Sequence, residues 1–281
     1  MLTRLFPTPS FITIPVVGID FSDATMRLVK LAETIHGFLP THFAEETIPE
    51  GCMKGGRISD EAKFVAFLSE VKKEHKLKYV RVAIPESQPY SFTLSLDVIA
   101  VSDIHGAIEL VLEDNIPLRR EETVFDYHII KQDEKSIIVQ VVAIASVTTQ
   151  NFLDSFIKAG LIPVSFELDG QAIARAVLKP KDKGSYMIVD FGANRTGITI
   201  TTAGTAVFTS TVEFGGQVLL DILQKELNIS VEEARRFKVD IGLSATGENK
   251  NIFQLLVGGV GTLKDEINKR YIYWHEKKDQ F

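Results

Sequence analysis

Two aspartates in this sequence close apolar, β-branched stretches in the same way. Asp20 is followed by Phe21 and a small residue, and Asp190 is followed by Phe191 and a small residue. In both places a short polar turn and a second β-branched stretch come next. A strand-end carboxylate can hold a hydrated Mg²⁺ ion, and turn N–H and hydroxyl groups can donate to phosphate oxygens. The two segments therefore predict a pair of nucleotide-binding hairpins.

Each aspartate taken alone is also an ordinary turn residue, because Asp readily caps its own backbone. The repetition of the whole arrangement favours the nucleotide-binding interpretation over the turn interpretation. A repeat of this kind is typical of a duplicated fold with two similar halves that face each other across a cleft.

The elements around these hairpins predict an α/β protein of two domains. Strands are expected at 14–20 and 26–31, a helix capped by Ser59 at 60–75, and a strand at 79–84. The order strand, helix, two strands, helix then indicates a small α+β insertion. The predicted divisions are residues 1–87 with 161–182 for the first domain, 88–160 for the inserted subdomain, and 183–281 for the second domain.

Composition narrows the class of protein. The 281 residues carry a formal net charge of −6, with 45% hydrophobic and 24% charged residues, as in soluble globular proteins. An acidic chain argues against nucleic acid as a partner. A single cysteine indicates a reducing compartment, and Cys52 itself is expected to be a loop residue. No apolar run reaches the ~18 residues of a membrane helix, and prolines interrupt residues 1–20, so neither direct membrane insertion nor a signal peptide is predicted.

Other signatures of nucleotide or metal sites are absent from the sequence. There is no Gly-x-x-x-x-Gly-Lys-Ser/Thr run and no His-Glu-x-x-His motif. The six histidines are scattered, and we expect them to be surface or core polar groups rather than ligands.

Together these segments resemble the actin-like ATPase superfamily, and within it the branch of the pilus-assembly PilM family and the cell-division FtsA family. Residues 17–27 and 188–196 are similar to the two phosphate motifs of that branch. Residues 213–216 and 229–238 are similar to its Gly-Gly helix start and the helix that follows. The insertion resembles the SHS2-type subdomain of the same branch. The implied fold is a ribonuclease H-like duplicated, actin-like fold of two domains.

The resemblance implies ATP with Mg²⁺ as cofactors, with the metal near Asp20 and Asp190. The other implied nucleotide-binding residues are Ser22, Asp23, Thr25, Arg27, Gly192, Ala193, Asn194, Thr196, Gly215, Gly216 and Lys238. Lys238 is equally well interpreted as a solvated helix residue. Glu167, which ends the strand after the insertion, is either a water-orienting catalytic residue or a helix-capping carboxylate.

The sequence departs from the family in three places. Ser22 stands where the family usually has Gly, which predicts a looser or altered first loop. Arg27 stands where the family usually has Lys, which keeps the charge but not the point-donor geometry. The adenosine motif is expected to be missing, although residues 258–261 could be a degenerate version of it. ATP binding is therefore predicted with weak or absent hydrolysis.

The function implied by the resemblance is that of a cytoplasmic assembly protein of a type IV pilus or related secretion machine. It would reach the inner membrane through a partner, by docking the cytoplasmic tail of a PilN-like protein in a groove between the first domain and the insertion. Other pilus assembly proteins are further expected partners, and self-association is left open. The alternatives are an FtsA-like cell-division protein and a small-molecule kinase of the same superfamily.

Overall fold

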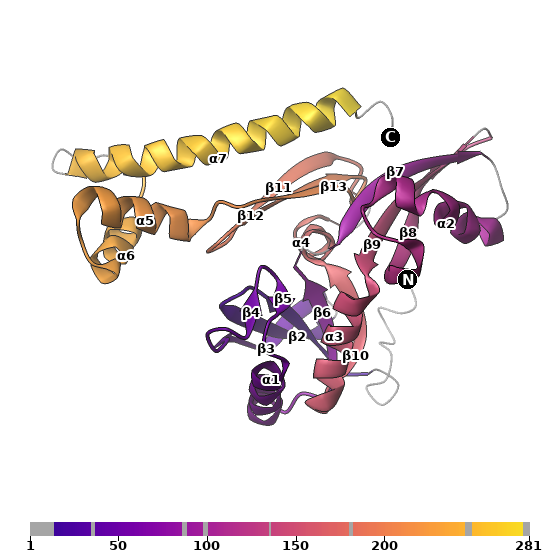
Figure 1. The fold of residues 1–281 in the computed structure, drawn as a ribbon, viewed down its shortest axis with the longest axis horizontal. Helices are drawn as coiled ribbons and strands as arrows, with labels where there is room; N and C mark the ends of the chain where they lie inside the picture. The colour runs from indigo at the N-terminus through magenta and orange to yellow at the C-terminus, as the bar shows by residue number, and fades with distance from the viewer. Residues whose placement is uncertain are drawn as a thin grey trace. The chain divides into compact units, whose positions relative to one another are not determined.

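The computed structural model of the chain describes residues 14–34, 37–85, 89–97, 101–134, 136–179, 182–244 and 249–277. It divides into two compact units, residues 1–176 and 177–281 (Figure 1). The division falls a few residues before the predicted boundary at 182, and the insertion belongs to the first unit.

The main sheet of the first unit has five strands in the order β10-β6-β1-β2-β3. The strands are β1 (Val16–Phe21), β2 (Thr25–Thr34), β3 (Gly37–Thr47), β6 (Tyr79–Ile84) and β10 (Ile162–Leu168). β1 pairs antiparallel with β2 and parallel with β6, which in turn pairs parallel with β10. The predicted hairpin at 14–31 and the predicted strand at 79–84 are confirmed.

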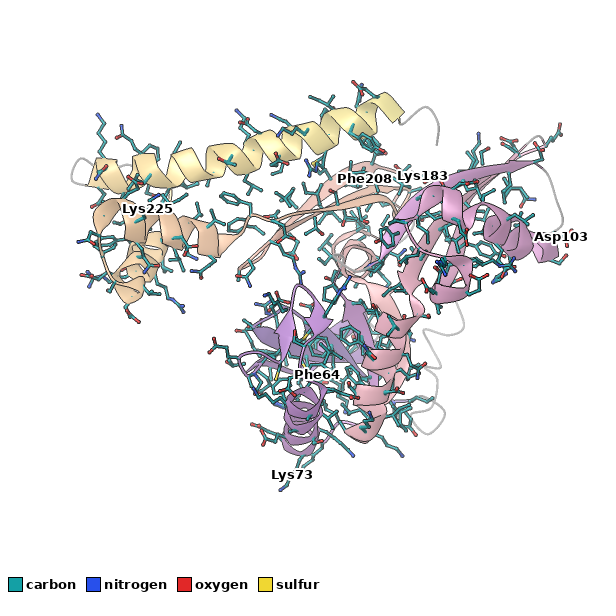
Figure 2. All side chains as sticks on the ribbon, in the orientation of Figure 1. Phe64, Lys73, Asp103, Lys183, Phe208 and Lys225 are labelled. Atoms are coloured by element: carbon teal, nitrogen blue, oxygen red, sulfur yellow. The ribbon has the colours of Figure 1, made fainter. Side chains whose placement is uncertain are left out.

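Helices α1 (Glu61–His75) and α3 (Ser146–Lys158) pack against this sheet and against each other. Phe64 points from α1 into the core and is fully buried (Figure 2). The prediction that Ser59 caps α1 is wrong. Asp60 is the N-cap, and its carboxylate accepts a hydrogen bond from the Lys63 N–H at 3.0 Å, because Asp60 directly precedes the first helical residue.

The insertion forms a three-stranded antiparallel sheet in the order β7-β9-β8. Its strands are β7 (Tyr90–Asp97), β8 (Thr123–Gln132) and β9 (Ser136–Ala145), and α2 (Ile104–Asn115) packs on one face. Short 3₁₀ turns, η2 (Val101–Asp103) and η3 (Arg120–Glu122), flank α2 and β8. The predicted α+β character of the insertion is confirmed.

The second unit contains an antiparallel sheet in the order β11-β12-β13, with strands Ser185–Phe191, Thr196–Thr202 and Thr205–Val212. Three helices follow, α5 (Gly216–Leu227), α6 (Val231–Asp240) and α7 (Lys250–Lys277). Residues 258–261 lie inside α7, so the interpretation of this segment as an adenosine-binding turn is wrong. A Cβ on Gly259 would lie 2.6 Å from Leu219 Cδ2, so this glycine lets α7 pack closely on α5.

Three strands were not predicted: β3 and the two-stranded ribbon of β4 (Met53–Lys54) and β5 (Arg57–Ile58). Helix α4 (Asp169–Val177) follows β10 directly. Among the described helices, none combines the length and the apolarity needed to span a bilayer.

Candidate functional site

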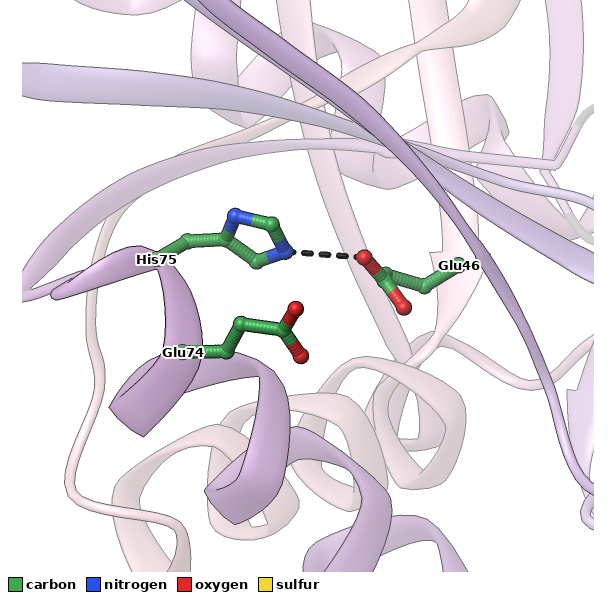
Figure 3. Close-up of side chains that lie close together, drawn as sticks. All are labelled: Glu46, Glu74 and His75. Carbon is green, nitrogen blue, oxygen red and sulfur yellow. Dashed lines mark hydrogen bonds and ion pairs between the residues drawn. The ribbon is translucent and has the colours of Figure 1, made fainter.

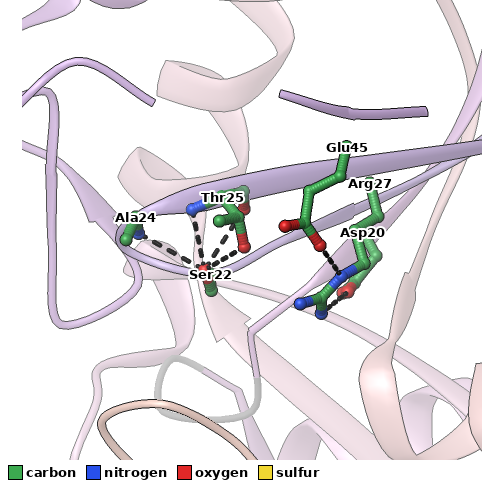
Figure 4. Close-up of polar contacts among 6 residues, drawn as sticks. All are labelled: Asp20, Ser22, Ala24, Thr25, Arg27 and Glu45. Atoms are coloured by element: carbon green, nitrogen blue, oxygen red, sulfur yellow. Dashed lines mark hydrogen bonds and ion pairs between the residues drawn. The ribbon is translucent and has the colours of Figure 1, made fainter. Parts of the chain in front are cut away.

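The first hairpin loop, residues 22–25, is closed by Ser22. The Ser22 N–H donates to the Thr25 carbonyl at 2.8 Å, and Ser22 Oγ accepts from the N–H groups of Thr25 at 2.9 Å and Ala24 at 3.3 Å. The hydroxyls of Ser22 and Thr25 lie 2.8 Å apart (Figure 4). The serine side chain therefore holds the turn together, so of the two predicted alternatives, a looser or an altered loop, the looser one is wrong.

Asp20 and Arg27 face each other across the same hairpin. They are register partners in the β1–β2 pair, and Arg27 Nη1 lies 4.0 Å from Asp20 Oδ2. Arg27 Nε also donates to Glu45 Oε2 at 2.7 Å, so the guanidinium sits between two carboxylates (Figure 4). All three side chains are about half exposed, and such pairs contribute little to folding stability. The carboxylate of Asp20 is accessible at the strand end, where a Mg²⁺ ligand was predicted.

Asp23 has a different partner. Its two carboxylate oxygens accept hydrogen bonds from the N–H groups of Gly55 at 2.9 Å and Gly56 at 2.8 Å. Both glycines have positive φ, of 58° and 74°, which lets the turn between β4 and β5 aim both donors at one carboxylate. Asp23 thus ties the loop to the β4–β5 turn, a contact that was not foreseen because this ribbon was not predicted.

The second hairpin loop, residues 192–195, is closed by the same backbone hydrogen bond, from the Gly192 N–H to the Arg195 carbonyl at 2.9 Å. It is further held by the start of α5. The Gly216 and Gln217 N–H groups donate to the carbonyls of Gly192 and Ala193 at 3.0 and 2.7 Å. The predicted helix N-terminus therefore lies beside the loop, with these two donors already engaged.

Close packing accounts for the glycine before α5. A Cβ on Gly215 would lie 2.5 Å from the Ala193 carbonyl oxygen and 2.7 Å from Arg195 N. Thr196 is also buried, and its hydroxyl donates to the Phe214 carbonyl at 2.6 Å, so Thr196 fastens the hairpin to the same segment.

The remaining predicted residues of the second unit lie around this loop. Asp190, Ala193 and Asn194 are exposed. Lys238 reaches from α6 to the start of α5, where Nζ donates to the Gly216 carbonyl at 3.3 Å. Burial, and to a lesser degree the nearby Arg235 charge, lower the pKa of Lys238. Each unit therefore presents one strand-end carboxylate beside a four-residue loop, and carboxylates are the ligands that Mg²⁺ prefers.

A groove of about 370 Å³ lies within the first unit, between the inserted sheet and the ends of β6 and β10. Five consecutive residues of β8, Val124 to His128, line it. Alternate strand residues point to opposite faces, and Phe125 and Tyr127 pack on the α2 side. Gln140, Val142 and Ile144 of β9 also line the groove and are register partners of His128, Asp126 and Val124. The groove therefore lies over the sheet face opposite α2 and extends to β8, an outermost strand of that sheet.

Two polar side chains of the groove, Gln140 and Glu167, are held by hydrogen bonds. Gln140 is buried, accepts from Thr93 Oγ1 at 2.9 Å and donates to Ser91 Oγ at 2.6 Å. Thr149 Oγ1 is shielded from solvent and has no hydrogen-bond partner among the described residues. Glu167 also lines the groove, and its carboxylate accepts from Arg175 Nη2 at 2.6 Å. The carboxylate predicted to be catalytic is thus ion-paired and lies beside the groove.

Comparison with known families identifies the group of proteins to which the chain is related. Residues 18–254 match the model of the family described as type IV pilus assembly protein PilM. The chain belongs to this family.

Solved structures agree on the fold. The PilM-PilN type IV pilus biogenesis complex superimposes with a TM-score of 0.78 at 16% identity, covering 94% of this chain and 78% of that chain. Ethanolamine utilization protein EutJ from Carboxydothermus hydrogenoformans gives 0.56 at 18% identity, covering 94% and 74%. MreB5 of Spiroplasma citri bound to ADP gives 0.57 at 13% identity, covering 92% and 78%.

These likenesses establish the actin-like α/β fold that was predicted. Membership of the PilM family makes the chain a type IV pilus assembly protein, as expected.

Proposed function

We propose that this pilus assembly protein docks the cytoplasmic tail of a PilN-like inner-membrane protein in the groove along β8. The proposal rests on the observation that β8 is an outermost strand of its sheet and lines the groove. Among the described strands, β8 is paired only with β9, so its other edge offers main-chain N–H and C=O groups to an extended peptide. The PilM-PilN complex pairs a protein of the same fold with PilN, which supports a partner of this kind.

Side chains around this edge indicate what kind of peptide fits. Val124 lies on β8 itself and can contact a side chain of an added strand, and Val142 and Ile144 of β9 extend the apolar floor of the groove behind it. Thr149, which also lines the groove, has a hydroxyl without a hydrogen-bond partner among the described residues, and a bound peptide group could supply one. The expected ligand is an extended segment with apolar residues at every second position.

The acidic side chains in and near the groove indicate the charge of the peptide that it would bind. Asp126 and Glu167 line the groove, and Glu121 and Glu122 are exposed just before β8. Within the described part of the chain, only Glu167 among these four has a cationic partner beside the groove, through Arg175. A tail with a basic residue near its apolar stretch would therefore be preferred.

We extend the proposal to the nucleotide. The loops after Asp20 and Asp190 would bind ATP with Mg²⁺, which would supply charge neutralisation at the phosphates. Bound nucleotide would then alter the affinity for the tail, with little or no hydrolysis. Recruitment through the tail would place the protein at the cytoplasmic face of the inner membrane.

Peptide binding tests the docking proposal. A fluorescent peptide of the partner's cytoplasmic tail should bind the full chain with a saturable change in anisotropy. Val124→Arg should weaken binding at least about tenfold, since Val124 is 48% exposed and the arginine would fill the groove. Val239→Arg, on α6 and 72% exposed, is the matched control and should bind normally. Equal affinities of the two variants would refute docking in the groove.

A further inference from the structure

A second cluster of ligating side chains lies on the first unit, between the end of β3 and the end of α1. Glu46, Glu74 and His75 each offer one ligand atom, and these atoms all lie within 4.8 Å of one another (Figure 3). His75 Nε2 is 2.8 Å from Glu46 Oε1. The His75 side chain is only 8% exposed and that of Glu46 is 26% exposed, so the imidazole is shielded from solvent and the Glu46 carboxylate partly so.

The other ring nitrogen of His75 is also engaged. His75 Nδ1 lies 2.9 Å from His42 Nε2, and the two rings are 5.1 Å apart between centroids. A metal-ligating histidine almost always donates its second ring N–H to a neighbouring acceptor, which fixes the tautomer and the ring orientation. With His75 Nε2 on a metal, Nδ1–H would donate to His42 Nε2.

Electrostatics at this place favour a cation. Glu74 and His75 lie in the last turn of α1, where the helix dipole leaves a partial negative charge. Glu46 adds a second carboxylate close to that of Glu74. Lys72 and Lys73 belong to the same turn, and Lys73 points away from the unit in Figure 2. A carboxylate at a helix C-terminus is destabilising by itself, whereas a bound dication would reverse the sign of the interaction.

We propose that Glu46, Glu74 and His75 form a site for a divalent transition metal of the zinc class, with His42 as the group that orients His75. One imidazole with two carboxylates and a fourth position for water is a coordination set that zinc accepts. The imidazole nitrogen distinguishes this site from the all-oxygen environment that Mg²⁺ prefers. The metal would fasten the end of β3 to the end of α1, and the site is independent of the groove and of the hairpin loops.

Titration of the metal-free full chain with Zn²⁺ or Co²⁺ tests the proposal. One equivalent should bind by calorimetry, and Co²⁺ should give visible absorption bands of a low-coordinate site. The thermal midpoint should rise with metal concentration. Glu74→Gln should lower the affinity at least tenfold, and His42→Ala should lower it about 10- to 100-fold through loss of the orienting contact.

The decisive variant is Glu74→Gln, because Glu74 is exposed and the substitution preserves its size. Glu70→Gln, one turn earlier on the same helix and also exposed, is the control and should bind normally. His75→Asn should abolish the cobalt bands, provided that its circular dichroism matches that of the parent chain. Absence of saturable binding, or equal binding by Glu74→Gln and Glu70→Gln, would overturn the proposal.

Discussion

In the first unit the loop after Asp20 is held by the side chain of Ser22, whereas in the second unit the loop after Asp190 is held by the backbone at the start of α5. Both loops span four residues and share one closing hydrogen bond, from the first residue's N–H to the fourth residue's carbonyl. One turn geometry is therefore stabilised in two ways. The first loop is held by one of its own side chains, and the second loop is held by the neighbouring helix.

The phenylalanines that follow the two aspartates show the same contrast. Phe21 is 3% exposed and packs against Phe64, Phe152 and Phe156, with ring centroids 5.6 to 6.4 Å apart. Phe191 is 45% exposed. β1 is paired on both sides and covered by α1 and α3, whereas β11 is paired only with β12 among the described strands. The phenylalanine of the same sequence motif is therefore a core residue in the first unit and a partly exposed residue in the second.

The largest difference between the two hairpins is expected from truncating these rings. Phe21→Ala should destabilise its unit by about 3–5 kcal/mol, because it opens a cavity in an aromatic core. Phe191→Ala should cost less than about 1 kcal/mol, because much of its ring is already in water. Urea denaturation monitored by circular dichroism measures both losses. Similar losses of stability for the two variants would show that Phe21 and Phe191 do not differ in burial as described.

The aspartates should differ in nucleotide binding, if the proposed role of the loops is right. Arg27 partly neutralises Asp20, whereas the register partner of Asp190 is Gly197, which has no side chain. Charged hydrogen-bonding groups contribute about 1.5–3 kcal/mol, or roughly 10- to 100-fold in affinity. The affinity for a fluorescent ATP analogue, measured with Mg²⁺, should therefore fall about 100-fold in Asp190→Ala and about tenfold in Asp20→Ala. Asp221→Ala, on the exposed side of α5, is the control and should bind as the parent does.

The packing of the second loop on α5 is tested at Gly215. Gly215→Ala should destabilise the second unit by about 1–3 kcal/mol, since the new Cβ meets backbone atoms that have little room to move. Gly258→Ala is the matched control, because its Cβ would meet nothing within 4 Å and the position is helical. This control should stabilise the unit by about 0.5–1 kcal/mol. The midpoint of thermal unfolding should fall in Gly215→Ala and rise in Gly258→Ala. An unchanged midpoint in Gly215→Ala would show that the loop is not held as described.

Much of the fold could be predicted from the sequence because many strands are rich in β-branched residues, as in β9, β12 and β13. β1 and the first part of β8 also alternate between more and less buried residues. The sequence of β3 gives no such strand pattern, because most of its side chains are exposed and it contains Pro40. Without β3, neither the Arg27–Glu45 contact nor the cluster around His75 could be foreseen, since both depend on residues of that strand.

The hydrogen bonds of the two loops could not be predicted from the sequence. Asp190, the Gly-Gly helix start and Lys238 lie around the second loop and Asp20 lies beside the first. Their role in nucleotide binding stays a prediction. Each polar turn contains a threonine, Thr25 or Thr196, but the two do not correspond in the structure. Met26 opposes Phe21 whereas Thr196 opposes Phe191, so Thr25 corresponds to Arg195. The sequence spacing differs by one residue between the two threonines, and only the strand register reveals which positions match.

The smallest effect on stability is expected at Ser22. Its hydroxyl holds the first loop through hydrogen bonds, as the start of α5 holds the second loop. Ser22→Gly gives the first loop the residue found at position 192, and it should cost about 0.5–1.5 kcal/mol through loss of the hydrogen bonds to Thr25 and Ala24. Ser22→Ala removes the same hydroxyl but keeps the Cβ, so it separates the hydrogen bonds from backbone freedom. Amide hydrogen exchange at Ala24 and Thr25 should accelerate in both variants, while exchange at Gly216 and Gln217 stays unchanged. If exchange in the first loop stayed slow, the Asp23 contacts to Gly55 and Gly56 would be sufficient to hold it, and Ser22 would not be the closing residue.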